Sequence, residues 1–402
     1  MSKIKLCKAV KYVDERISVK NVPIENFVTV DNLIPNKGGI TVAGNMPPQG
    51  GSLPLFRKDD ILVGNIRPYL KKIWFSDREG GAAADVLIFN VKKEYYPKYI
   101  YYAMFRDDFF NHMMKGKKGT KMPRGDKNQI MEFLVPDFKY PTQQRIAAVL
   151  SVLDAKIELN NRINAELEAM AKTLYDYWFV QFDFPFDFAS TPLSTGAQGK
   201  PDKNGKPYKS SGGKMIWNEE LKREIPEGWE VAKLSNLVNI TTGKLDSNAE
   251  VLGGKYPFFT CASEPATIDS YAFDDSVILV AGNNASGNFH INRYKGKFNA
   301  YQRTYVITAK DIEYLEYIYQ VLIMETYLMK NRGNGSQTKF ITLGMLTDIR
   351  VFSSISYVMN EFYKLTKSLF EEQMNYFLQN KTLSTLRDWL LPMLMNGQAK
   401  AV

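Results

Sequence analysis

The residues best suited to chemistry in this chain are cations interleaved with aromatic and amide side chains. In the first 140 residues they follow a hydrophobic run at 61–63 and recur in a glycine-rich basic segment at 115–124. Lysine and backbone N–H groups suit phosphate oxygens, whereas arginine, asparagine and glutamine can read base edges through paired hydrogen bonds. The candidate DNA-binding residues of this part are Arg67, Tyr69, Lys71, Lys72, Lys117, Lys118, Lys121 and Arg124.

A second set of the same kind lies between residues 225 and 355. Aromatic residues alternate with cations at 293–303, and a glycine-hinged segment rich in amides and hydroxyls follows at 332–339. The candidates here are Arg293, Lys295, Lys297, Gln302, Arg303, Arg332, Asn334, Ser336, Gln337 and Lys339. Any one of these segments taken alone could equally be a solvated loop. Their number favours binding to an anionic polymer.

The motifs of common catalytic sites are missing from the sequence. No GxxxxGK[ST] loop is found, and no GxGxxG follows a predicted strand. His112 and His290 lie in different halves of the chain. The aspartate pairs at 59–60 and 274–275 lack the further ligands of a nuclease metal site, so solvated turns before strands are the better interpretation. We predict no catalytic residue and no metal site.

Composition sets the class of protein. The chain has 402 residues, 45% of them hydrophobic, and a net charge of +9, which allows two or three domains and an anionic partner. Its two cysteines, Cys7 and Cys261, are far apart and fit no disulfide framework or metal spacing. No segment approaches the roughly 18 apolar residues of a membrane span. We therefore expect a cytoplasmic protein without a membrane partner.

Two long helices are predicted to position the basic segments. In each helix, residues spaced alternately three and four positions apart form a stripe along one face, which indicates a partner helix. We expect the two helices to pack antiparallel against each other as a coiled coil. The first stripe comprises Leu150, Leu153, Ile157, Asn160, Asn164, Leu167, Ala171, Leu174 and Trp178. The second comprises Phe362, Leu365, Leu369, Glu372, Tyr376, Gln379, Leu383, Leu386, Leu390 and Met393. A buried asparagine at 160 or 164 would fix the register, although either could equally face solvent.

The sequence also indicates an internal duplication. The segment Asp60–Asn65 is echoed by Val277–Asn283, and 119–136 by 335–352, at offsets of roughly 216 to 218 residues. The predicted fold class is α+β, with two α/β domains separated by two long antiparallel helices in an internal pseudo-two-fold repeat. Such a two-headed chain suggests recognition of a target that itself has two parts.

Three segments resemble conserved regions of the specificity subunits of type I restriction-modification systems. They are the run PTQQRIAAVLSVLDAKIELNNRINAELEAMAKTLYDYWFVQF at 141–182, the linker GKPYKSSGGKMIWNEELKREIPEGWEV at 205–231, and LRDWLLPMLMNGQ at 386–398. The resemblance in layout spans essentially the whole chain. It implies a target-recognition domain at 1–140, a central conserved helix at 141–182, a linker or arm at 183–224, a second target-recognition domain at 225–355 and a C-terminal conserved helix at 356–402.

The resemblance implies a sequence-specific DNA-binding subunit that directs methylation and cleavage without catalysing either. Each domain would read one half of a bipartite site in double-stranded DNA. Two modification (methyltransferase) subunits would carry S-adenosylmethionine, restriction/translocase subunits would use ATP and Mg²⁺, and this chain would hold no cofactor.

Surface aromatics on the second helix are predicted to bind the modification subunits, since such residues often anchor interfaces. The candidates are Phe370, Phe377 and Trp389, unless they pack against the neighbouring domain. Three other functions compete with this reading of the chain. They are a stand-alone two-domain DNA-binding regulator, a coiled-coil assembly protein, and a methyltransferase or nuclease, against which the missing motifs argue.

Overall fold

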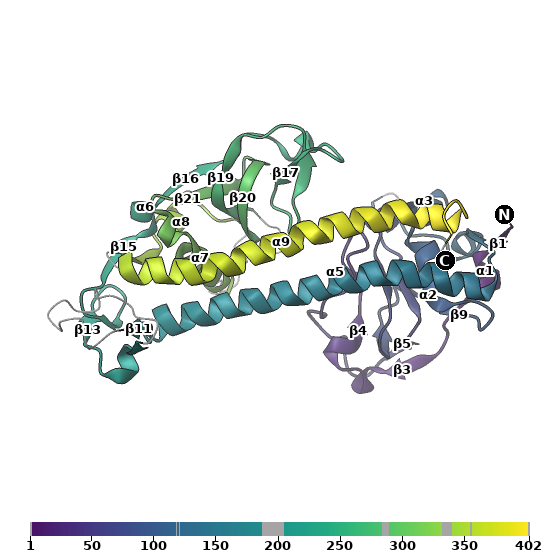
Figure 1. Ribbon diagram of the computed structural model, residues 1–402. Helices are drawn as coiled ribbons and strands as arrows, with labels where there is room; N and C mark the ends of the chain where they lie inside the picture. The colour runs from purple at the N-terminus through teal and green to yellow at the C-terminus, as the bar shows by residue number, and fades with distance from the viewer. Residues whose placement is uncertain are drawn as a thin grey trace. The chain divides into compact units, whose positions relative to one another are not determined.

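The computed structural model describes residues 2–117, 119, 121–186, 205–283, 289–331, 340–353 and 356–400. The chain divides into two compact units, and each is described by itself (Figure 1). Unit 1 comprises Met1–Asn161 and Phe377–Val402, and unit 2 comprises Arg162–Tyr376.

Unit 1 is built on two four-stranded sheets. In spatial order the first contains β2 (Val10–Tyr12), β9 (Val86–Val91), β6 (Ile61–Gly64) and β7 (Ile73–Phe75). The second contains β3 (Arg16–Ser18), β5 (Ser52–Phe56), β8 (Gly80–Ala82) and β4 (Phe27–Val28). Further short elements are β1 (Lys3–Lys5), which pairs with β10 (Leu134–Pro136), and the helices α1 (Leu6–Ala9), α2 (Pro97–Phe105), α3 (Asp107–Lys115) and α4 (Lys127–Met131).

Alternation along the buried strands separates two cores in unit 1. Ile61 and Val63 point into a core shared with the helices, which also contains Leu150 and Leu391. Leu62, one residue out of phase, joins a smaller core between the two sheets. Because successive side chains of a strand face opposite sides, this continuous hydrophobic run serves both.

Unit 2 contains a six-stranded sheet. Its spatial order is β16 (Val238–Thr242), β21 (Thr304–Ala309), β19 (Phe273–Ala281), β20 (Ile291–Ala300), β17 (Tyr256–Phe259) and β18 (Ala266–Ile268). The helices beside it are α6 (Leu234–Leu237), α7 (Leu315–Asn331) and α8 (Leu343–Thr347). Three two-stranded pairings complete the unit: β11 (Pro185–Phe186) with β12 (Lys206–Pro207), β13 (Met215–Asn218) with β14 (Arg223–Pro226), and β15 (Glu230–Lys233) with β22 (Arg350–Ser353).

The two units repeat one topology, which confirms the predicted duplication. The order β2-β9-β6-β7 in unit 1 recurs as β16-β21-β19-β20 in unit 2. Ile61 pairs with Phe89 and Ile278 pairs with Ile307, and within its unit each pair faces the helical core. Ile61 and Ile278 are therefore equivalent. The predicted echo is wrong by one residue at its end, because this register aligns Asn65 with Gly282 instead of Asn283.

Helix α5 (Tyr140–Tyr175) and helix α9 (Ser356–Met395) each contribute residues to both units. In unit 1, Arg387 Nη1 lies 2.9 Å from Asp154 Oδ1, and Asn160 Nδ2 donates to Asn380 Oδ1 at 2.9 Å. Residue numbers rise along one helix as they fall along the other, so the helices are antiparallel here. Asn160 is fully buried, and its amide also reaches Gln379, so the solvent-facing alternative is wrong for Asn160.

The same direction holds in unit 2. Gln373 Nε2 donates to the carbonyl oxygen of Asn164 at 3.2 Å, and the Trp178 ring lies 5.7 Å from that of Phe362. Trp178 belongs to a single π turn (Asp176–Val180) that follows α5 directly. The predicted antiparallel arrangement is therefore confirmed within each unit.

The predicted stripe is right for α5 and partly wrong for α9. Every predicted stripe residue of α5 is buried or half-buried, whereas Leu365, Glu372 and Leu386 on α9 are exposed. The exposed stripe residues are spread along α9 from Leu365 to Leu386, whereas Leu390 and Met393 near its end are half-buried, so a strict heptad does not describe its buried face. The buried side chains of α9 are Val358, Met359, Phe362, Thr366, Phe370, Leu391, Leu394 and Met395.

Candidate nucleic-acid interface

In unit 1, main-chain hydrogen bonds join two of the predicted basic segments at the end of β6. Arg67 N donates to Pro123 O at 2.8 Å, and Gly125 N donates to the main-chain oxygen of Asn65 at 3.4 Å as well as to its Oδ1 at 3.1 Å. Asn65 N in turn donates to Asp85 O at 2.9 Å. Three segments far apart in sequence therefore meet at one edge, which we call the unit 1 edge and define as 65–67, 83–85 and 123–125.

Cations of the unit 1 edge are exposed. Arg67 is exposed in a left-handed backbone conformation (φ 51°), and nearby Tyr69 is 50% exposed. Arg124 forms a surface ion pair with Asp85 at 3.1 Å. A surface pair of this kind is weak and can be exchanged for a phosphate or a base. Lys117 and Lys121, in the neighbouring segment, are also exposed.

Two predicted lysines beside this edge already have protein partners. Lys71 Nζ lies 2.8 Å from Asp107 Oδ2, a carboxylate that also pairs with Lys37. Lys72 is 8% exposed and donates to the carbonyl oxygen of Val30, and burial lowers the pKa of its ammonium. The structure thus corrects the prediction for Lys72, which is a structural residue. Lys118 lies outside the described residues.

In unit 2 the same geometry recurs at the end of β19. Gly282 N donates to Arg303 O at 2.8 Å, and Ile341 N donates to Gly282 O at 2.9 Å. These bonds match those of Asn65 with Asp85 and Gly125, so Arg303 occupies the position of Asp85. We call 282–283, 301–303 and 340–341 the unit 2 edge. A hollow at this edge is lined by Thr242, Gly282, Asn283, Gln302, Arg303, Tyr305, Phe340 and Ile341.

The unit 2 edge exposes two of the predicted base-reading side chains. Gln302 and Arg303 are both exposed, and Gln302 Nε2 makes one long contact of 3.4 Å to Asp246. Within the described residues, the Arg303 guanidinium makes no side-chain hydrogen bond. The adjacent Phe340 ring is 60% exposed. The predicted contacts Arg332, Asn334, Ser336, Gln337 and Lys339 lie outside the described residues.

Arg293 is wrongly predicted as a surface contact. Its side chain is 6% exposed and pairs with the equally buried Glu316 at 2.8 Å. The guanidinium also lies 4.2 Å from the centroid of the Phe370 ring and donates to the carbonyl oxygen of Val277. Arginine suits such a site because its flat guanidinium can stack and form an ion pair at once. Arg293 therefore ties β20, α7 and α9 together within unit 2.

Lys295 and Lys297 are exposed but lie away from the unit 2 edge. They pair with Ser276 and Asp274 near the start of β19, whereas the edge lies at its end. Lys297 also lies over the Tyr271 ring, at 4.7 Å from its centroid. The structure therefore does not bring these two lysines together with Arg303.

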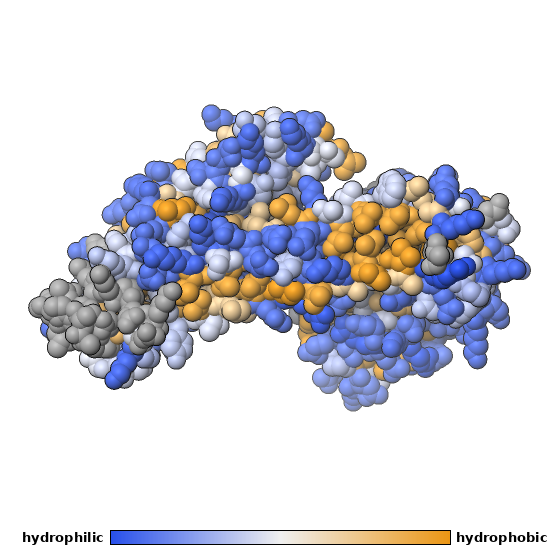
Figure 2. Space-filling view, in the orientation of Figure 1, coloured by the Kyte–Doolittle hydropathy of each residue, from blue (hydrophilic) through white to orange (hydrophobic). Residues whose placement is uncertain are grey.

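Predicted partner-binding aromatics on α9 divide into two groups. Phe370 is buried under Arg293, which corrects its assignment as a surface anchor. Trp389 is 58% exposed, and Phe377 is 39% exposed. Within unit 1, Trp389 lines a shallow hollow with Lys381, Thr382, Thr385 and Leu386. Figure 2 shows hydrophobic residues gathered over this end of α9.

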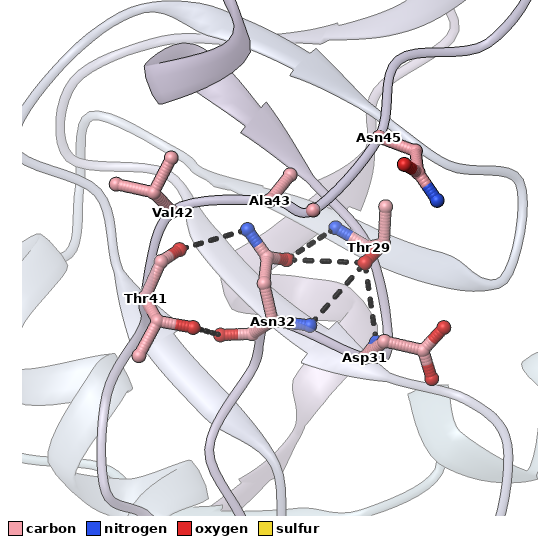
Figure 3. A pocket seen from close by; sticks show the side chains of 8 residues that line it. Thr29, Asp31, Asn32, Thr41, Val42, Ala43 and Asn45 are labelled. Carbon is pink, nitrogen blue, oxygen red and sulfur yellow. Dashed lines mark hydrogen bonds between the residues drawn. The ribbon is translucent and has the colours of Figure 1, made fainter. Parts of the chain in front are cut away.

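Sequence reasoning missed one further feature of unit 1, a hollow formed by the segment 29–45 (Figure 3). The segment has neither a charge run nor a recognisable motif, and only the fold shows that it lies next to the unit 1 edge. The described residues contain no group of three His, Cys, Asp or Glu side chains that could hold a metal ion. None of the helices in the described part is long and apolar enough to cross a membrane.

Comparison with known proteins gives concordant matches. A family model described as "Type I restriction modification DNA specificity domain" matches residues 11–169 and 226–352. The type I restriction enzyme EcoDI specificity subunit of Escherichia coli is 45% identical over 128 residues, which cover 32% of this chain and 28% of that protein. The HindI specificity subunit of Haemophilus influenzae is 24% identical over 449 residues, covering 96% of both.

A solved structure shares the fold. The S subunit of a type I restriction-modification system from M. genitalium matches with a TM-score of 0.52 and 17% sequence identity, over 98% of this chain and 95% of that chain. At this identity the match supports the architecture of the chain and nothing finer.

Proposed function

We propose that this chain recognises a bipartite site in double-stranded DNA, because it belongs to the family of type I restriction-modification DNA specificity proteins. Its relatives are specificity subunits, which recognise DNA and do not catalyse, so the chain is a recognition subunit and not an enzyme. Each unit would read one half of the site, and the chain would direct methylation and cleavage by its partner subunits.

The observation that carries this proposal is the repetition of one edge in the two units. In each unit, equivalent main-chain hydrogen bonds bring three separate segments together at the end of equivalent strands. Each edge presents an exposed arginine, Arg67 in unit 1 and Arg303 in unit 2. An arginine can pair with two acceptors of guanine, and the loops around it differ between the units, so each edge could read different bases.

The proposed partners follow from the family and from the surface of α9. Two modification subunits would dock on the conserved helices and supply S-adenosylmethionine, while restriction/translocase subunits would supply the ATP- and Mg²⁺-dependent steps. We expect this chain to bind no cofactor itself and to act in the cytoplasm. Exposed Trp389 and Leu386 support a docking surface, because large exposed side chains of this kind are typical anchors.

Replacing Arg303 with alanine tests the reading role of the unit 2 edge. We expect the assembled complex to lose about 1–3 kcal/mol of discrimination at one position of one half-site, because a paired arginine–base contact is lost. Methylation rates on DNA substituted at each position would measure this loss. Arg350→Ala, which removes an arginine paired with Glu220 on the surface of unit 2, is the matched control.

The pattern of the loss identifies the contact. An equal loss on all sequences would make Arg303 a phosphate contact, and unchanged methylation would remove it from the interface.

Replacing Trp389 with alanine tests the docking surface. The variant should fold normally but fail to co-purify with the modification subunit, since it removes the largest exposed side chain of the hollow. Trp217→Ala is a close control, because Trp217 is 57% exposed against 58% for Trp389 and lies on the β13–β14 hairpin. Equal recovery of complex with both variants would show that the partner binds elsewhere.

A further inference from the structure

The hollow at 29–45 lies beside the unit 1 edge. Its first residues follow β4, and Ala83 N donates to Val28 O at 2.8 Å, which places them next to the edge segment 83–85. On its other side, Lys37 N donates to Lys71 O at 2.9 Å. The segment is therefore fastened both to the edge and to the loop that follows Arg67.

Asn32 holds the hollow in shape. It is 5% exposed, and its Oδ1 accepts from Thr29 N at 2.7 Å while its Nδ2 donates to Phe27 O at 3.0 Å and Thr41 O at 2.9 Å (Figure 3). With both donor hydrogens used, the Asn32 amide organises the two ends of the segment and offers no donor to a ligand.

Two polar side chains at the hollow remain available. The Asp31 carboxylate and the Asn45 amide are exposed, and within the described residues neither side chain makes a hydrogen bond. Figure 3 shows both extending away from the Asn32 network, with Val42 on the other side. Val42 is 61% exposed, so its methyl groups also face outward.

The negative charge of the Asp31 carboxylate limits what this hollow could bind. An ionised carboxylate accepts hydrogen bonds only and repels phosphate, so Asp31 is unsuited to the DNA backbone. In the major groove, the donors offered by base edges are the exocyclic amino groups, N4 of cytosine and N6 of adenine. These base amino groups, and not the phosphates, are therefore the DNA partners that suit Asp31.

We propose that this hollow is a base-reading subsite of unit 1, in which Asp31 accepts a hydrogen bond from an exocyclic amino group. Asn45 adds a second polar contact, and Val42 lies against the apolar edge of the same or the next base. The inference rests on the proposed function and extends it, by assigning one position of one half-site to a carboxylate.

The segment that forms this hollow differs between the two units. In unit 2 the segment after β17 turns into β18 at Ala266, whereas in unit 1 the long segment 29–51 separates β4 from β5. Because the subsite belongs to one unit, a change within it should affect one half-site and leave the other unchanged.

Asp31→Asn in the complete complex with its modification subunits is the test. The side chain keeps its size but its charge is lost and one of its acceptors becomes a donor. We expect discrimination at one position of the unit 1 half-site to fall by about 5- to 150-fold, measured by methylation of a library randomised in each half-site. Asp14→Asn, an exposed aspartate of the same unit, is the matched control and should change nothing.

Base analogues distinguish the two amino groups. Uracil in place of cytosine, or hypoxanthine in place of adenine, removes the amino group at the affected position. The matching analogue should impair the wild-type complex and have little effect on Asp31→Asn. A uniform tightening on all sequences would reduce Asp31 to a general electrostatic effect and overturn the proposal, as would an unchanged base preference. If the wild-type complex instead showed no sequence preference, the proposed function itself would fail.

Discussion

Replacing Phe179 with alanine should lower the free energy of unfolding of unit 2 by about 3–5 kcal/mol, the usual cost of truncating a buried phenylalanine. Phe179 is 2% exposed, and its ring centroid lies 4.6 Å from that of Tyr317 and 5.0 Å from that of Phe362. It therefore joins the turn after α5 to α7 and α9 within one core. Urea unfolding followed by tryptophan fluorescence would measure the change, since Trp178 and Trp229 belong to the same core.

Tyr177→Ala supplies the control for this measurement. Tyr177 belongs to the same turn but is 48% exposed, so its truncation should cost well under 1 kcal/mol. Similar losses for both variants would mean that the aromatic core of unit 2 is not as described.

Replacing Glu316 with alanine should destabilise unit 2 by about 3–5 kcal/mol, because the Arg293 guanidinium would remain buried without its partner. Removing both charges with Arg293→Met and Glu316→Leu should recover most of that loss, since buried pairs can often be replaced by apolar side chains. The same unfolding measurement applies to the single and the double variants.

This series also tests the corrected role of Arg293. A structural residue should affect unfolding far more than base preference. If Glu316→Ala left stability unchanged, or if Arg293→Met altered discrimination at one base while stability held, Arg293 would return to the list of DNA contacts.

Features that depend on periodicity or on internal repetition could be predicted from the sequence. The α5 stripe follows from periodicity within one helix. The repeat of the two units follows from segments that echo one another roughly 216 to 218 residues apart, and the opposite directions of the helices follow from that repeat. The α9 stripe was only partly right, because burial along this helix depends on what packs against it, as Arg293 packs against Phe370. The equivalence of Asn65 with Gly282 could be established only from the strand register. The similarity of the two sequences alone aligns Asn65 with Asn283, one residue further on.

The candidate interface residues could also be predicted only in part. Exposed cations such as Arg303 follow from composition and position, whereas the fate of Arg293 depends on Glu316, 23 positions away, and on Phe370 from a third element. The hollow around Asn32 depends on hydrogen bonds to Phe27 and Thr41 that no motif announces. Tertiary partners thus decide which polar side chains remain free to bind.

The central claim is that the two units read two different half-sites, and methylation mapping of paired variants tests it most directly. The recognition sequence of the complex would be determined from methylated DNA for the wild type, Arg67→Ala and Arg303→Ala. We expect Arg67→Ala to relax one half-site and Arg303→Ala to relax the other, with the spacing between them unchanged. If both variants relaxed the same half-site, or if the wild type read one uninterrupted sequence, the claim would be contradicted.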